Sequence, residues 1–239
     1  MHGQAHTLIA RYLGGVSGAH RAAKSGAMVV VVDTYRASTT IAVLVSKGAI
    51  VFPVATIEEA SEMDADLRVG ERGSAKLSGF DFGNSPTSLG KAAIEPGSNV
   101  ALTTTNGTRV IEAAAGAPGV LAGAFVNAGA VARALLERSA GSEVVVVGCG
   151  WEGHRASEDE VAGGAILCHL QRGGANLDKR ARRMVNRYLR MSRQTLKSNS
   201  AARRLKRLGH EEDLDYCLSE DVVPVVPTLR TGAFVEGRK

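Results

Sequence analysis

The chain of 239 residues is long enough for one large domain or two small ones, and its 4% aromatic content argues against a carbohydrate-binding or single-strand stacking surface. Three widely spaced cysteines favour neither a disulfide framework nor a zinc site, and no apolar run approaches the roughly 18 residues of a membrane span. The formal net charge of +5 arises in one segment, because residues 172–209 hold 13 Lys or Arg and one acid, Asp178. Residues 1–12 lack a signal-peptide pattern, so we expect a cytoplasmic protein.

The first half of the chain alternates short apolar runs with helical patterns. Strands are predicted at 7–13, 29–32, 49–54 and 67–70, and helices at 17–24, 38–47 and 56–64, with an N-cap at Ser17 and a capping box at Thr56 and Glu59. This βαβ order predicts a three-layer α/β/α fold with a largely parallel or mixed central sheet. We expect residues 1–239 to form this single domain.

The second half continues the alternation and then becomes helical. Strands are predicted at 99–103, 120–121 and 143–147, and helices up to 115, at 127–137 and from an N-cap at Ser157 to about 170. The basic segment at about 172–209 predicts two or three short helices, and an acidic helix follows at 211–218. A last strand at 222–226 is expected at a sheet edge, because Pro224 and Pro227 cannot donate ladder hydrogen bonds.

The most informative stretch is V-V-V-V-D-T-Y-R-A-S-T-T at 29–40. A buried strand delivers Asp33, Arg36, Ser38 and Thr39 to its carboxyl end, where open α/β sheets bind ligands and helix N-termini offer free N–H groups. An anion could meet Arg36 and the hydroxyls there while Asp33 holds a cation, which suggests phosphate chemistry. The alternative is that Asp33 only caps the turn that follows.

Two more segments offer groups for an anion. Residues 70–88 form a long loop with charged tips, in which Ser85 or Thr87 can cap the helix after Pro86. The sequence T-T-T-N-G-T at 103–108 follows another strand and opens another helix. A substrate with several negative charges needs such Arg side chains and N–H groups. The candidate substrate-binding residues are Arg36, Ser38, Thr39, Arg72, Asn84, Ser85, Thr104, Thr105, Asn106, Gly107, Thr108 and Arg109.

Adjacent carboxylates, Glu158 and Asp159, lie in the first turn of the helix after strand 143–147. Taken alone, they are explained by the helix dipole, which favours negative charge at an N-terminus. Together with Asp33 at another strand end they predict a hard-cation site, and carboxylate oxygens with water ligands indicate Mg²⁺. Asp33, Glu158 and Asp159 are therefore candidate metal ligands, Asp33 and Glu158 are also candidate catalytic residues, and Glu71 is the candidate general base.

Three other patterns suggest other classes of protein. Glycines 148, 150 and 153 match the dinucleotide fingerprint G-x-G-x-x-G of an oxidoreductase, but no second strand ending in an acid follows about 20 residues on. The haloacid-dehalogenase signature needs a second Asp where Tyr35 stands. The basic segment could bind nucleic acid, yet its apolar stripe of Met184, Tyr188 and Met191 favours a solvated helical face, near the anionic pocket or a subunit contact.

Six ordered motifs resemble the 2-phosphosulfolactate phosphatase family over nearly the whole chain. They are D-T-Y-R-A-S-T-T (33–40), G-E-R-G-S-A-K-L-S-G-F-D-F-G-N-S-P (70–86), T-T-T-N-G-T (103–108), G-x-F-x-N (123–127), S-E-D with A-G-G-A (157–165) and D-Y-C-L-S-x-D (215–221). The chain departs from the family pattern in its extended basic segment and in Ala156, where a bulkier residue is expected.

The resemblance implies a magnesium-dependent phosphatase on an α/β fold unlike other phosphatases. The implied reaction releases phosphate from (R)-2-phospho-3-sulfolactate, a step of coenzyme M biosynthesis in methanogens, although many bacterial members lie outside that pathway. The substrate is then a small phosphorylated anion. We expect a homo-oligomer, and neither a nucleic-acid nor a membrane partner.

Overall fold

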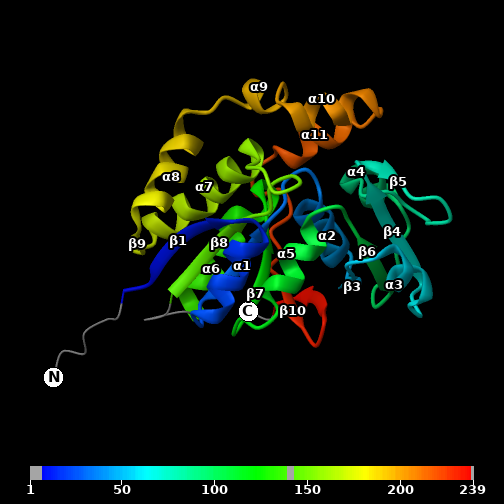
Figure 1. The fold of residues 1–239 in the computed structure, drawn as a ribbon, viewed down its shortest axis with the longest axis horizontal. Coiled ribbons are helices and arrows are strands. Elements are labelled where there is room, and N and C mark those ends of the chain that lie inside the picture. Colours follow the sequence, from blue (N-terminus) through cyan, green and yellow to red (C-terminus); the bar gives the residue numbers. More distant parts are fainter. Residues whose placement is uncertain (1–6, 139–142, 238–239) are drawn as a thin grey trace.

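The computed structural model describes residues 7–138 and 143–237, which form one sheet covered by helices (Figure 1). The predicted single domain also includes residues 1–6, 139–142 and 238–239, which lie outside the described part. No helix in the described ranges is long and apolar enough to cross a membrane.

The strands coincide with the apolar runs of the sequence, apart from the two strands of two residues each and the C-terminal hairpin formed by the last two strands. They are β1 (Ile9–Gly14), β2 (Met28–Val32), β3 (Ile50–Pro53), β4 (Leu67–Arg72), β5 (Ala75–Lys76), β6 (Asn99–Thr103), β7 (Val120–Gly123), β8 (Glu143–Gly148), β9 (Asn176–Leu177), β10 (Pro227–Arg230) and β11 (Ala233–Glu236).

The helices occupy the segments between these strands. They are α1 (Gly15–Lys24), α2 (Ala37–Ser46), α3 (Ile57–Glu62), α4 (Pro86–Lys91), α5 (Gly107–Ala114), the 3₁₀ turn η1 (Phe125–Asn127), α6 (Ala128–Arg138), α7 (Ser157–Arg172), α8 (Lys179–Arg190), α9 (Arg193–Leu196), α10 (Ser200–Arg207) and α11 (Glu211–Cys217).

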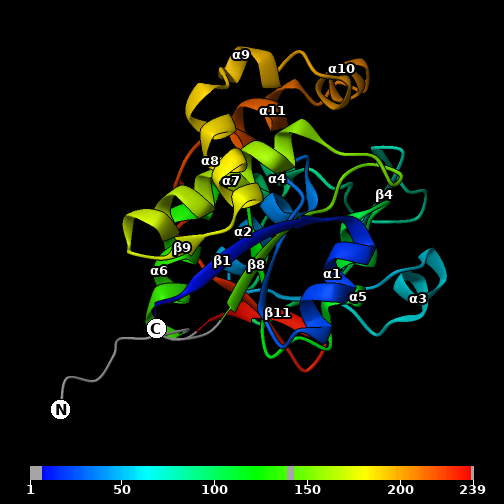
Figure 2. The same cartoon turned by 60° about the vertical axis from the view of Figure 1, so that its left-hand side comes forward.

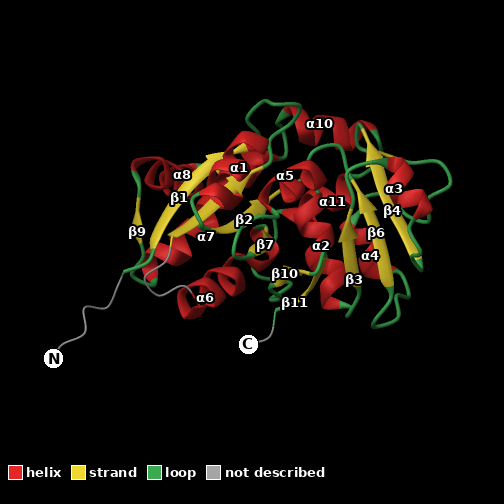
Figure 3. Cartoon of the chain, turned by 60° about the horizontal axis from the view of Figure 1, so that its bottom comes forward, coloured by secondary structure: helices red, strands yellow, loops and turns green. Residues whose placement is uncertain are grey.

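The strand order is β5-β4-β6-β3-β11-β10-β7-β2-β8-β1-β9. Strand pairs are parallel except for β4 with β5 and the pairs made by β10 and β11, so the prediction of an α/β fold with a largely parallel or mixed sheet is confirmed. Figure 3 shows β9 and β1 at one end of the molecule and β6 and β4 at the other.

Helices cover β2 on both faces. Val29 and Val31 pack in a core with α1, α2 and α5, whereas Val30 and Val32 pack in a second core with α6, α7 and α8. A continuous β-branched run is what a parallel strand buried on both sides requires. The three layers that the sequence predicted follow from this burial.

The parallel register brings several strand ends to one place. Val32 pairs with Gly123 of β7 on one side and with Gly148 of β8 on the other. The Cys149 N–H then donates to Val32 O at 2.9 Å, so the turns after β2 and β8 are adjacent. Farther along the sheet, Gly70 of β4 pairs with Thr103 of β6, and the turns after these two strands are adjacent as well.

The C-terminal hairpin differs from the prediction. The predicted edge strand at 222–226 is wrong, since those residues form no strand, and the hairpin β10–β11 begins at Pro227 and lies inside the sheet. Thr228 pairs with Leu121 of β7 and the fully buried Phe234 pairs with Val51 of β3. The hairpin therefore joins two groups of parallel strands, a long-range role that local sequence does not reveal.

Helix N-caps were predicted with mixed success. The capping box of Thr56 and Glu59 is confirmed, and Ser85 is confirmed as the cap of α4. Ser17 and Ser157 are not N-caps. The N-cap of α1 is Gly14, so Ser17 lies inside its first turn, and the N-cap of α7 is Ala156, so Ser157 is its first residue. In place of a cap, Ser157 Oγ donates to Glu158 Oε2 at 3.3 Å.

The basic segment forms three helices, α8, α9 and α10, as predicted. Ala181, Met184 and Val185 of α8 are buried against the core that contains α7, and a Cβ atom on Gly164 of α7 would lie 2.2 Å from Met184 O. This glycine lets the two helices approach closely. Figure 2 shows α9, α10 and α11 together at one end of the molecule.

Candidate active site

Asp33 is the first residue after β2, and the side chains that follow it fix its turn. Its Oδ1 atom accepts a hydrogen bond from the Ala37 N–H at 3.2 Å, and the Asp33 N–H donates to Ser38 Oγ at 2.9 Å. Asp33 therefore does cap the turn, as the alternative interpretation held. Its Oδ2 atom accepts no hydrogen bond from residues 7–138 or 143–237, and the side chain lines a cavity.

Asp159 connects the turn after β2 to the loop after β8. Its Oδ1 accepts from the Thr34 N–H at 2.8 Å and its Oδ2 accepts from the Gly150 N–H at 2.9 Å. Its neighbour Glu158 accepts from Asn199 Nδ2 at 2.7 Å. The acids at the start of α7 and Asp33 thus line the same cavity, which is the convergence that the sequence predicted.

Glu71, at the end of β4, adds a fourth carboxylate to this cavity. Its Oε1 accepts from the Thr105 N–H at 2.7 Å, while its Oε2 accepts from the Ser74 N–H at 2.6 Å and from Thr105 Oγ1 at 3.1 Å. These bonds hold the turn after β4 against the turn after β6. They favour a structural role for Glu71, in which it fixes the two turns together, and its role as a general base stays a prediction.

The cavity between these acids is small and polar. Its volume of about 20 Å³ holds about one water molecule or one ion. Asn84 also lines it, and the buried Oδ1 of Asn84 accepts no hydrogen bond in the described structure. A buried acceptor without a partner costs free energy, so this atom is suited to a donor that enters with a ligand.

The crowded carboxylates perturb one another. Burial, together with the charges of Glu71 and Glu158, raises the pKa of Asp33 to about 7 from its usual 3.8. Burial, with the charges of Asp33 and Glu158, raises the pKa of Asp159 well above its usual value, and burial also raises the pKa of Glu158. Four carboxylates line the cavity against the two guanidinium groups of Arg36 and Arg204, and a bound cation would offset the cost of ionising these acids there.

Arg204 of α10 is a cavity residue that the sequence did not single out. Its guanidinium lies 3.6 Å from the centre of the Trp151 ring, and its Nε donates to Ser74 Oγ at 3.0 Å. Asn199, the N-cap of α10, holds Glu158 from the same segment. No local pattern distinguishes Arg204 from the 12 other basic residues of its segment, because its place depends on how the segment packs.

Arg36 lines the cavity, but its guanidinium forms hydrogen bonds with other residues of the protein. Its guanidinium donates to Asp213 Oδ2 at 2.6 Å and to Ser74 O at 2.9 Å, with both Arg36 and Asp213 almost fully buried. Asp213 also accepts from Ser85 Oγ and from Thr87 Oγ1. The network joins α2, α4 and α11, so a substrate-binding role for Arg36 stays a prediction.

Most of the other predicted substrate-binding side chains bond to their own surroundings. Ser38 Oγ donates to Val31 O, Thr39 Oγ1 to Thr34 O and Thr108 Oγ1 to Thr104 O. Thr104 Oγ1 accepts from the Thr108 N–H, Ser85 bonds to Asp213, and Thr105 bonds to Glu71. Arg72 donates to Glu71 O, Ala55 O and Thr103 Oγ1. Their predicted roles in substrate binding remain untested.

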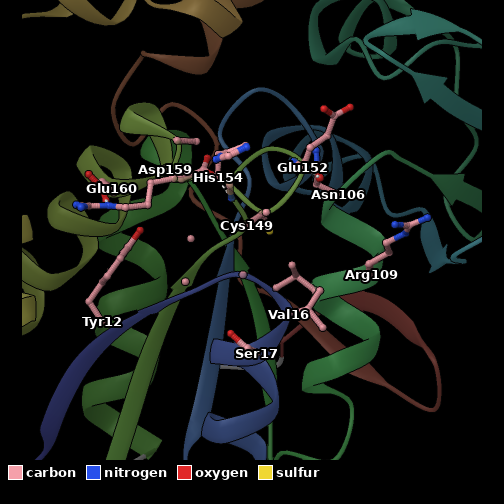
Figure 4. Close-up of a pocket in the computed structure, with 18 of the residues that line it drawn as sticks. Tyr12, Val16, Ser17, Asn106, Arg109, Cys149, Glu152, His154, Asp159 and Glu160 are labelled. Atoms are coloured by element: carbon pink, nitrogen blue, oxygen red, sulfur yellow. Dashed lines mark hydrogen bonds and ion pairs between the residues drawn. The ribbon is translucent and has the colours of Figure 1, made fainter.

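A second, larger cavity of about 400 Å³ adjoins the acidic one (Figure 4). Asn106, Gly150 and Asp159 line both cavities. The predicted residue Arg109 faces this larger cavity and does not line the acidic one. Of the predicted anion-binding groups, Asn106 alone borders both spaces, with its Oδ1 accepting from the Glu152 N–H at 3.1 Å.

An α/β sheet with a polar cavity at the carboxyl ends of its strands has the architecture of an α/β enzyme. A family model described as 2-phosphosulpholactate phosphatase matches residues 16–232. The chain belongs to the 2-phosphosulfolactate phosphatase family, a family of phosphoric monoester hydrolases. The resemblance read from the six motifs is thereby confirmed.

Curated relatives agree with this assignment. The chain is 38% identical over 210 residues to a probable 2-phosphosulfolactate phosphatase of Thermotoga petrophila, a match that covers 86% of this chain and 90% of the relative. It is 36% identical over 214 residues to the protein of the same description from Thermosynechococcus vestitus, covering 83% and 87%. A third, from Gloeobacter violaceus, is 38% identical over 219 residues, covering 87% and 91%.

Proposed function

We propose that this protein hydrolyses the phosphate monoester of 2-phosphosulfolactate, or of a closely related small phosphorylated acid, to sulfolactate and phosphate in a reaction that requires Mg²⁺. The observation that carries the proposal is the convergence of Asp33, Glu71, Glu158 and Asp159 on one small cavity. Family membership supports the reaction class, and the excess of negative charge supports the cation.

The residues at the cavity suit Mg²⁺. This ion prefers oxygen ligands and is commonly bound by one or two carboxylates, several waters and the substrate phosphate. Among the described residues no three His, Cys, Asp or Glu side chains form a group that could hold a metal ion by themselves, so waters and the substrate phosphate would have to complete its coordination. Asp33 Oδ2 and Glu158 would hold the ion, and Asp159, bonded to two backbone N–H groups, would add charge and fix the two turns. The bound ion would neutralise and polarise the phosphoryl oxygens.

The chain's own groups supply orientation and charge. The Arg204 guanidinium is fixed by its stack on Trp151 and its bond to Ser74, so its remaining N–H groups are held at the cavity. Donors fixed in this way stabilise the charge that develops on transferring phosphoryl oxygens. Asn84 Oδ1 would accept a hydrogen bond from a water in the cavity and orient it. Because the cavity holds about one ion or water, these assignments place the phosphoryl group at its mouth, between Arg204 and Asp33.

The function is tested by phosphate release from a series of small phosphorylated acids, with Mg²⁺ and with EDTA. We expect release from 2-phosphosulfolactate that EDTA abolishes. We expect Arg204→Ala to lower kcat about 100-fold, since the loss of one fixed donor to a developing oxyanion costs that much in other enzymes. Arg207→Ala, which removes an exposed guanidinium from the same helix, is the matched control and should keep the wild-type rate.

Three results would each contradict part of the proposal. Release at equal rates in Mg²⁺ and in EDTA would remove the metal from the reaction. Failure to release phosphate from any acid of the series would remove the function itself. Equal losses in Arg204→Ala and Arg207→Ala would show that net charge, and not the placement of Arg204, matters.

Gly107, the first residue of α5, lies against Asp33. A Cβ atom there would be 2.8 Å from Ala37 Cβ and 2.9 Å from Asp33 Oδ2, closer than such atoms pack. We expect Gly107→Ala to displace Asp33 and to lower kcat by about tenfold or more, because small misplacements of reacting groups are costly. Gly90→Ala on α4 is the control, since its Cβ would meet nothing within 4 Å. Equal activity of the two variants, measured by phosphate release, would show that Asp33 does not need its present position.

A further inference from the structure

The 400 Å³ cavity beside the acidic site has no role in the chemistry above. It lies between β1, α1 and α5 and the loop after β8. Figure 4 shows Tyr12 and Arg109 on opposite sides of it, with Val16 and Ser17 of α1 on a third side. Because Asn106, Gly150 and Asp159 border both spaces, a molecule whose phosphoryl group lies at the mouth of the acidic cavity can extend into the larger one.

Tyr12 presents an unused donor to this cavity. The side chain is 2% exposed and its hydroxyl forms no hydrogen bond with any residue that the structure describes. The hydroxyl lies over the end of β8, since a Cβ atom on Gly148 would come within 2.2 Å of it. Burial and the nearby charges of Asp159 and Glu160 raise the pKa of Tyr12 well above its usual value, so the hydroxyl keeps its proton. A hydroxyl that faces a cavity and has no protein partner is suited to an acceptor on a ligand.

The N-terminus of α1 faces the same space. Gly15, Val16 and Ser17 line the cavity, no side chain caps this end of the ten-residue helix, and its first turn carries no acid. Free N–H groups at a helix start favour a negatively charged group. Together with the Tyr12 hydroxyl, they supply several donors at this wall.

Two guanidinium groups at the cavity, those of Arg109 and Arg180, form no ion pair with an acid among the described residues. Glu160 is neutralised by Arg155 at 2.5 Å and by Arg187 at 2.7 Å. Arg180 lies with its guanidinium carbon 5.4 Å from the centre of the Tyr12 ring, and neither it nor Arg109 pairs with an acid in the described ranges. The remaining carboxylates are Asp159, which is held by backbone N–H groups, and Glu152, which is exposed.

We propose that this cavity binds an anionic oxyacid group of the substrate, a sulfonate or a carboxylate on the part that leaves with the ester oxygen, through Tyr12, Arg180 and the start of α1. The inference rests on the proposed function, because that function places the phosphoryl group at the acidic cavity and therefore the rest of the substrate in the larger one. It assigns recognition of the leaving group to β1, α1 and the basic segment, and phosphoryl chemistry to the ends of β2, β4 and β8.

Three variants test the site from different sides. Tyr12→Phe removes one hydroxyl and keeps the buried ring. Arg180→Gln removes a charge, with Arg182→Gln on the exposed face of α8 as its matched control. Gly14→Val narrows the cavity without removing a donor, because Gly14 has an extended backbone, φ −145°, and its Cβ would meet only Gly148 O at 3.7 Å and Arg180 at 3.8 Å.

The first readout is steady-state phosphate release from 2-phosphosulfolactate and from 2-phospholactate, which lacks the sulfonate. We expect Tyr12→Phe and Arg180→Gln each to raise KM for 2-phosphosulfolactate about tenfold with little change in kcat, since a hydrogen bond to a charged group contributes that much to binding. Gly14→Val should raise the same KM because its side chain takes up space in the cavity. If the cavity binds the sulfonate, KM for 2-phospholactate stays unchanged. If it binds the carboxylate, KM for both substrates rises together.

The second readout needs no turnover. Calorimetric titration with sulfolactate and with lactate should show that the wild type and Arg182→Gln bind sulfolactate about tenfold more tightly than Tyr12→Phe and Arg180→Gln do. Equal affinity in all four proteins, or no binding of either acid by the wild type, would overturn the site. If binding follows the expectation while no phosphate is released, the anion site stands and the proposed phosphatase function falls.

Discussion

Replacing Asp33 by Asn is expected to lower kcat for phosphate release about a thousandfold or more, and at the same time to raise the thermal stability of the metal-free protein at about pH 8. Activity falls because Asn lacks the charge that would hold Mg²⁺ and bring it to the phosphoryl group. Stability rises because the substitution removes a buried negative charge from beside Glu71 and Glu158. Asn keeps an oxygen that can accept the Ala37 N–H, so the turn is preserved.

The sign of the stability change follows from the raised pKa of Asp33. Between its usual pKa of 3.8 and the folded value of about 7, the folded protein retains a proton that the unfolded chain has lost. Stability from this group is therefore full below about pH 4 and is lost as the pH rises to about 7. The Asn variant escapes this loss, so the difference between the two proteins grows across that range and is largest above it.

Differential scanning calorimetry in EDTA at several pH values measures this effect. We expect the variant to be more stable than the wild type by about 4 kcal/mol at pH 8, because the pKa rises from 3.8 to about 7 and each pKa unit corresponds to about 1.4 kcal/mol. This is about 10 °C in Tm for a chain of this size, and the two proteins should be equally stable near pH 4. Saturating Mg²⁺ should raise the Tm of the wild type and leave that of the variant unchanged. A variant that keeps activity within tenfold of the wild type, or that melts lower at pH 8, would contradict the role given to Asp33.

The sequence predicted the acidic half of the site because the rule behind it is local. Asp33 directly follows a buried strand, and Glu158 and Asp159 begin the helix after another. In a parallel sheet the carboxyl ends of neighbouring strands meet at one edge. The pairing of Val32 with Gly148 then places these acids together. The first step is local, and the second needs only that β2 and β8 are neighbours in the parallel sheet.

The cationic half of the site could not be predicted in the same way. Arg180 and Arg204 belong to a segment with 13 basic residues, and only its packing selects these two. Others in the segment form ion pairs, such as Arg187 with Glu160 and Lys197 with Asp215. The sequence therefore indicated that the segment could form a helical face near the anionic pocket, but it did not show which of its residues line the cavities.

Polar side chains near a strand end were also easier to locate than to interpret. Residue type alone does not show whether a hydroxyl faces a ligand or its own backbone. Ser38 and Thr39 form hydrogen bonds within the turn after β2, whereas Tyr12, which sequence reasoning assigned no role, has a free hydroxyl in a cavity. The difference depends on the direction of each side chain, which tertiary packing decides.

Arg36→Met is expected to destabilise the protein by about 3–5 kcal/mol, or about 10 °C in Tm, because it leaves the buried Asp213 without its charged partner. Arg36 and Asp213 are 2% and 1% exposed, and their side chains are 2.6 Å apart. The matched control is Lys91→Met, since Lys91 pairs with Glu212 at 2.7 Å but both side chains are more than 70% exposed. Exposed pairs contribute about 1 kcal/mol or less, so the control should melt close to the wild type.

A double variant separates the two roles that Arg36 could have. Arg36→Met with Asp213→Asn keeps an oxygen for Ser85 and Thr87 and removes the unpaired charge, so it should recover about half of the lost stability. If Arg36 is structural, KM measured well below Tm should stay within about threefold of the wild type in both variants. A large rise in KM without loss of stability would instead place Arg36 among the substrate-binding residues. The buried ion pair predicts the first result, because the charge of Arg36 is paired with Asp213 and both of its terminal nitrogens already donate within the protein.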